Sequence, residues 1–150
     1  MSKRRQHMRN RPTIADMAKA FGAIDAMLAR LADGWIHTMH GQPVFFNRPD
    51  ETWYDIPAAL EGWVALWERI SDKYGLGLDL APLSRLAAKL NHGMHTSPEE
   101  VARCAEIVVA CKRHYRSMDV YEIRKVVNTQ LIANQVESMG LAGTSASAQG

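Results

Sequence analysis

Residues 97–140 read SPEEVARCAEIVVACKRHYRSMDVYEIRKVVNTQLIANQVESMG, a stretch that predicts two long helices separated by a short break. The first helix begins at Ser97, whose hydroxyl can cap free backbone N–H groups, and Pro98 suits a position that needs no N–H donor. The second helix begins with the capping-box spacing of Asp119 and Glu122 and ends at Gly140. Apolar residues recur along the first helix at steps of three and four, which places them on one face: Val101, Cys104, Val108, Cys111 and Tyr115.

Three more helices are expected to pack on this pair. Thr13 opens a helix over 13–32, Asp55 and Pro57 open one over 56–74, and Pro82 opens a short one over 82–91. With helices near 98–117 and 119–139, the fold is predicted to be mainly α, with about five helices in a single orthogonal or bundle-like domain. A chain of 150 residues, 47% of them hydrophobic, can bury one hydrophobic core and so form one domain. The domain should span 12–140, between a disordered basic arm over 1–11 and a disordered tail over 141–150.

The helix over 13–32 carries a heptad repeat that has two interpretations. Its apolar members are Ile14, Met17, Phe21, Ile24, Leu28 and Leu31. They form either an internal packing face against the 97–140 pair or the seam of a homodimer. The segment 14–22 also resembles the first half of a repressor-type helix-turn-helix, with Ala18 and Gly22 at its small-residue and turn positions, and this resemblance implies DNA reading. Residues 83–109 have similar helix-turn-helix proportions.

Between the first two helices, short β-prone runs predict a hairpin near 35–54. The runs at 35–39 and 44–47 flank a turn at 40–43, and residues 52–54 suit a third short strand. An aromatic β-surface can anchor a peptide or stack bases, whereas the same rings can instead fill a core. The scarcity of basic residues around them favours core filling over base stacking. The five aromatic residues of this unit are also candidate protein-contact residues: Trp35, Phe45, Phe46, Trp53 and Tyr54.

The net charge of +2 conceals an uneven distribution of basic residues. The arm carries basic side chains and no acidic one: Lys3, Arg4, Arg5, Arg9 and Arg11. A second group lies where the two long helices meet: Lys112, Arg113, Arg116, Arg124 and Lys125. Together they predict a patch that binds nucleic-acid phosphates without reading sequence. The alternatives are a solvated terminus and cations that suit a helix C-terminus.

The sequence contains few features that indicate metal binding or catalysis. Metal-ligand spacing occurs in one weak candidate set: His92, His95, Cys111 and His114. Neither a glycine-rich phosphate loop nor a nucleophile elbow occurs, so no catalytic residue and no cofactor are predicted. Cys104 and Cys111 lie about 10 Å apart along one helix, too far for a disulfide, which favours reduced thiols and a cytoplasmic location. No apolar run reaches the length of a membrane span.

These observations favour a non-catalytic helical adaptor or regulatory protein that acts through protein contacts, including self-association. The alternative is a DNA-associated accessory or regulatory protein that binds phosphates through the basic arm and the helix-pair corner. The third functional hypothesis is a zinc-binding protein or an enzyme.

Overall fold

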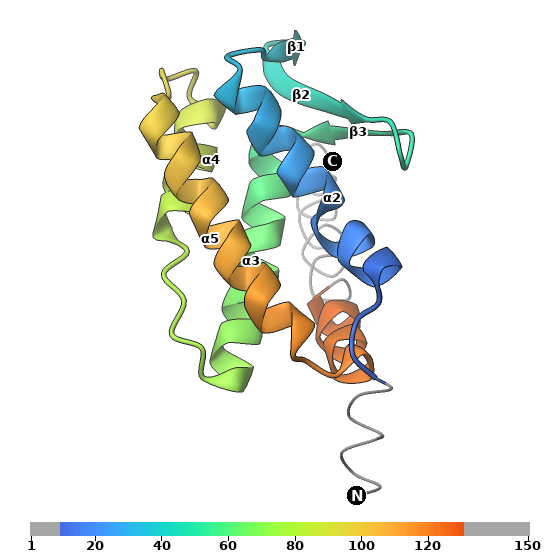
Figure 1. Cartoon of the computed structure of the whole chain (residues 1–150). Helices are drawn as coiled ribbons and strands as arrows, with labels where there is room; N and C mark the ends of the chain where they lie inside the picture. Colours follow the sequence, from blue (N-terminus) through green and yellow to red (C-terminus); the bar gives the residue numbers. More distant parts are fainter. Residues whose placement is uncertain (1–9, 131–150) are drawn as a thin grey trace, which may run out of the picture.

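The computed structural model describes residues 10–130 (Figure 1). The helices are α2 (Ile14–Ala32), α3 (Ile56–Tyr74), α4 (Ala81–Asn91) and α5 (Pro98–Arg116), followed by a helical segment over 120–130. Strands β1 (His37–Met39), β2 (Gln42–Asn47) and β3 (Thr52–Asp55) lie between α2 and α3. The mainly α fold with a small inserted β unit is therefore confirmed. The predicted helix over 119–139 is described only up to residue 130, and its remainder, the tail over 141–150 and residues 1–9 lie outside the described residues.

Local capping groups fix where the helices begin. The Thr13 side chain accepts a hydrogen bond from the backbone N–H of Asp16 (3.1 Å), and the Asp16 carboxylate accepts one from the backbone N–H of Thr13 (2.9 Å). Ser97 and Glu100 form the same reciprocal box at the start of α5. Such caps satisfy N–H groups that have no partner inside the helix. Both predicted helix starts are confirmed.

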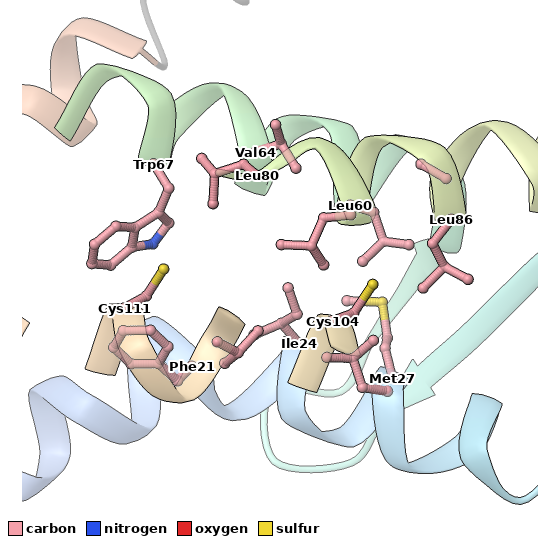
Figure 2. Packing of buried hydrophobic residues seen from close by; sticks show 14 of the residues in the cluster. Phe21, Ile24, Met27, Leu60, Val64, Trp67, Leu80, Leu86, Cys104 and Cys111 are labelled. Atoms are coloured by element: carbon pink, nitrogen blue, oxygen red, sulfur yellow. The ribbon is translucent and has the colours of Figure 1, made fainter. Parts of the chain in front are cut away.

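The core lies where α2, α3, α4 and α5 meet. In Figure 1, α5 crosses beside α2 with α3 behind them, and α4 packs against α3 and α5. Figure 2 shows the thiol of Cys111 pointing toward Trp67, beside the Phe21 ring, while Cys104 lies further along the same helix. Both cysteines are free thiols with no exposed surface. The apolar stripe predicted for α5 therefore faces the core.

The heptad repeat of α2 divides into a buried part and an exposed start. Phe21, Ile24, Leu28 and Leu31 are buried, which agrees with internal packing. Ile14, the first member of the predicted repeat, is 90% exposed. Because α2 is one uninterrupted helix through Gly22, the helix-turn-helix resemblance over 14–22 is wrong.

The sheet is antiparallel in the order β1-β2-β3, and β3 lies where the sequence suited a third short strand beside the hairpin. Phe45 pairs with Tyr54 and Phe46 pairs with Trp53. Residues directly opposite each other share a face, and neighbours along a strand point to opposite faces. Phe45 and Tyr54 therefore face the helices, whereas Phe46 and Trp53 face outward. Strand β1 begins at His37, two residues later than predicted.

Candidate interaction surfaces

The outward face of the sheet gathers exposed aromatic and apolar side chains. We call this set the outer sheet face; it consists of His37, Met39, Phe46 and Trp53 in the strands, with Trp35 beside His37 just before β1. Trp35 is 62% exposed and Trp53 54%, although both are large rings that usually bury most of their surface. Phe46 and Trp53 contact each other with ring centroids 5.2 Å apart, and Trp35 lies edge-on to His37 at 5.8 Å. Each pair of rings is therefore in contact while remaining open to solvent.

Two of the five predicted protein-contact residues lie away from this face. Phe45 belongs to the core and is 9% exposed. Tyr54 is half-buried, and its hydroxyl donates a hydrogen bond to Asp50, which raises the pKa of the Tyr54 phenol. The sequence could not separate the inward rings from the outward ones, because strand alternation gives their spacing but not which side meets the helices.

An apolar groove of about 290 Å³ lies on another side of the molecule and was not predicted from the sequence. We call it the apolar groove. It runs between α2, α3, Tyr54 of β3 and the helical segment over 120–130, with small side chains in its walls. The indole N–H of Trp63, also a lining residue, is buried without a hydrogen-bond partner among the described residues. A buried donor without an acceptor is costly, so this indole N–H is an unfavourable feature of the packing beside the groove.

The start of the described chain is held at the corner between α5 and the next helical segment. The side-chain amide of Asn10 donates to the Asp119 carboxylate (3.0 Å), and the backbone N–H of Val120 donates to the Asn10 carbonyl (2.7 Å). The disordered arm was predicted to extend through Arg11, whereas Asn10 is in fact tied to this corner. The contact brings Arg11 toward the second predicted basic group.

The exposed arginines at this end of the molecule form what we call the basic corner: Arg11, Arg113, Arg116 and Arg124. Arg124 lies over the Tyr121 ring at 5.6 Å. Hydrogen bonds with Thr13 are the main cause of the lowered pKa of Asp16, and the charge of Arg124 also contributes. The basic corner and the outer sheet face lie at opposite ends of the molecule (Figure 1).

Two predicted phosphate-binding lysines already have acidic partners. Lys112 forms an ion pair with Asp25 at 2.6 Å, and Lys125 forms one with Glu122 at 3.3 Å. Glu122 also pairs with Lys73 at 3.2 Å. The remaining predicted cations lie outside the described residues: Lys3, Arg4, Arg5 and Arg9.

The weak zinc candidate is wrong for the part of the chain that the structure describes. His92 and His95 lie in the exposed loop before α5, whereas Cys111 lies in the core. Within residues 10–130, no group of three or more histidine, cysteine or acidic side chains could hold a metal ion. Burial raises the pKa of Cys104 to about 11 and that of Cys111 to about 12. Both are therefore protonated thiols at neutral pH, which makes them poor ligands and nucleophiles.

Over residues 10–130, no helix combines the length and apolar character needed to cross a membrane. Comparison with protein-family models, curated proteins and solved structures finds no match. The functional argument therefore rests on the chain's own surfaces.

Proposed function

We propose that this protein is a non-catalytic adaptor or regulator that binds a protein partner through the outer sheet face. The observation that carries the proposal is the exposure of the paired Phe46 and Trp53 on one side of the sheet, together with the exposure of Trp35 just before β1. Tryptophan is enriched at the centres of protein interfaces, where it excludes water over a large area. Strand pairing and ring contacts hold Phe46 and Trp53 in place, so binding loses little side-chain freedom.

The test replaces Phe46 and Trp53 together by threonine, which keeps strand preference while removing the rings. The control is Tyr121→Gln, which removes a ring of 56% exposure at the other end of the molecule. Truncating one central aromatic anchor typically costs about 2 kcal/mol or more, roughly 30-fold in Kd. Proteins crosslinked to the wild-type chain in its own cells should be lost with the double variant and retained with the control. Identical partner sets for all three chains would contradict the proposal.

The partner can be a second copy of this chain, and sedimentation velocity tests that arrangement. Self-association through apolar contacts predicts a concentration-dependent dimer that persists in raised salt. Replacing Phe46 and Trp53 together by threonine should dissociate this dimer at both salt concentrations. A dimer that persists in the double variant would place the interface elsewhere.

A second candidate function, phosphate binding by a DNA-associated regulator, is favoured by one contact. The hydrogen bonds that join Asn10 to Asp119 and Val120 hold the residue before Arg11 at the turn that follows Arg113 and Arg116 in the chain. Exposed arginines at one corner suit electrostatic binding to a nucleic-acid backbone.

A salt series of binding to a labelled DNA duplex tests this second candidate. Each phosphate contact removed by Arg113→Gln or Arg116→Gln should lower the magnitude of the slope of log K against log salt by about 0.9. The matched control is Arg85→Gln on α4, away from the basic corner. Equal slopes for all three variants and wild type, or no binding at low salt, would exclude the candidate.

A further inference from the structure

Part of one edge of the sheet has no partner strand. Strand β1 pairs with residues 42–44 of β2, whereas β2 continues past them as far as Asn47 (Figure 1). On its other side, β2 stays paired with β3 to its end. Before β1 the chain turns away toward α2, where the backbone N–H of Trp35 donates a hydrogen bond to the Arg30 carbonyl (3.2 Å). Residues 45–47 therefore have one open edge in the part of the chain that the structure describes.

The backbone N–H and C=O of Phe46 point to this open edge. In an antiparallel pair of strands, hydrogen-bonded residues alternate with residues that form no hydrogen bond across the pair. Pro43, which lies opposite Thr38, has no N–H, so Gln42 and Val44 are the residues that bond to β1. Phe46 follows two positions later, and its backbone groups face the same side. Among the described residues, no backbone hydrogen bond reaches Phe46 from that side.

A cleft of about 300 Å³ lies between this edge and α2, and we call it the edge cleft. Residues 45–49 form one of its walls, and the last turns of α2 form the other. The small side chains of Ala26 and Ala29 lie in the α2 wall. A strand added to a sheet lies about 4.8 Å from its neighbour, so it needs such space beside the open edge.

Two arginines line the edge cleft, Arg30 from α2 and Arg48 from the turn after β2. Both are exposed, and neither forms an ion pair within the described chain. Asp33 is the acidic residue among the described lining residues, so arginines outnumber acids there. A carboxylate accepts strong, charge-assisted hydrogen bonds from guanidinium groups. The edge cleft therefore suits an acidic segment.

We infer that the protein partner adds an extended segment to the open edge of β2 and places an acidic side chain against Arg30 and Arg48. Backbone hydrogen bonds to Phe46 supply affinity, and the arginines select the acidic side chain. The same edge of a second copy is a poor occupant, because pairing would bring the arginines of both copies together. The inference rests on the proposed function, since it describes the segment by which that protein partner binds.

The test selects short random peptides, displayed on phage, for binding to the full chain. Enriched peptides should share an acidic residue within a β-prone sequence, and fluorescence anisotropy then gives their Kd. Each amide of one enriched peptide is methylated in turn, which removes its donor. Methylating the amide that donates to the Phe46 carbonyl should weaken binding roughly tenfold. The amides on either side of it point away from β2, so methylating them should change Kd by no more than about twofold.

The charge requirement is tested with Arg30→Gln and Arg48→Gln combined. This double variant should weaken peptide binding by about tenfold or more, because it removes charge-assisted hydrogen bonds. Replacing the acidic residue of the peptide by its amide should cause a similar loss, and the two changes together should cause little more. The matched control is Arg69→Gln, which changes an exposed arginine of α3 outside the edge cleft and should bind the peptide as wild type does.

Three results would overturn the inference: enrichment of no peptide, a methylation scan without one sensitive amide between two tolerant neighbours, or equal binding by the double arginine variant and the control. Failure of the proposed function gives a different result. Replacing Phe46 and Trp53 by threonine keeps the backbone of the open edge and both arginines, so cellular partners retained by that variant would exclude the outer sheet face alone.

Discussion

Replacing Phe21 by alanine should be among the most damaging single changes to this fold. Phe21 is 2% exposed and contacts three other rings. Its ring centroid lies 5.2 Å from that of Tyr115 at an interplanar angle of 89°, 5.9 Å from that of Trp67 and 6.2 Å from that of Trp63. The edge-on contacts with Tyr115 and Trp63 have favourable aromatic geometry.

The magnitude follows from burial and from these ring contacts. Phenylalanine to alanine in a core costs about 3–5 kcal/mol, and each favourable aromatic pair contributes roughly 0.5–1.5 kcal/mol beyond burial. We therefore expect Phe21→Ala to lose about 4–5 kcal/mol, a large share of the roughly 5–15 kcal/mol that stabilises a typical domain. With a urea m-value of about 2 kcal/mol/M, the midpoint should fall by about 2 M.

Urea unfolding followed by tryptophan fluorescence and near-UV circular dichroism measures this effect, because Trp63 and Trp67 flank the altered site. Ile14→Ala is the matched control on the same helix, and at 90% exposure Ile14 should change stability by no more than about 0.5 kcal/mol. A loss below about 1 kcal/mol for Phe21→Ala would refute the packing argument. A loss for Ile14→Ala as large as that for Phe21→Ala would show instead that the start of the heptad repeat is buried in an oligomer.

Three further predictions use other parts of the molecule. Burial raises the pKa of Cys104 to about 11 and that of Cys111 to about 12. A thiol reagent at pH 8 should therefore label neither cysteine in the folded protein and both cysteines in urea. Fast labelling of the folded protein would contradict this prediction. The hydrogen bond from Lys89 holds the pKa of Glu100 below its ordinary value of 4.5, so the resulting stabilisation is complete above that value and is lost as the pH falls through the lowered folded-state pKa. Glu100→Gln should therefore flatten the acid side of a plot of unfolding free energy against pH. Identical plots for wild type and variant would refute the connection between the lowered Glu100 pKa and stability in acid. Ser71→Ala removes the acceptor of a backbone N–H in the loop after α3 and should cost about 1–3 kcal/mol in urea unfolding, whereas a change near zero would show that water replaces the hydroxyl.

Helix boundaries were predictable because their causes are local. The capping boxes that start α2 and α5 each involve residues three apart, so the sequence contains all the information needed. Helical periodicity likewise identified the buried stripe of α5. Periodicity overestimated the buried face of α2, because Ile14 continues the repeat beyond the point where a neighbouring helix covers it.

The surfaces were less predictable because they depend on contacts between distant segments. Phe45 and Phe46 are neighbours with similar chemistry, and only the packing of β2 on the helices decides which of them is exposed. The apolar groove needs α2, α3 and the segment over 120–130 to be placed together before it exists. Lys112 looked available for phosphates because Asp25, its partner, lies 87 positions away in the sequence.

The Asn10 contact with Asp119 also has a consequence for folding kinetics. It joins residues 109 positions apart, and closing so long a loop is entropically unfavourable until the intervening chain is ordered. Contacts such as that between α3 and α4 are far more local and should form earlier. We therefore expect this corner to form last and to open first, as a sub-global unfolding unit whose amides exchange with solvent faster than those of the α5 core. Such opening would free Asn10 from Asp119 while the central helices remain folded.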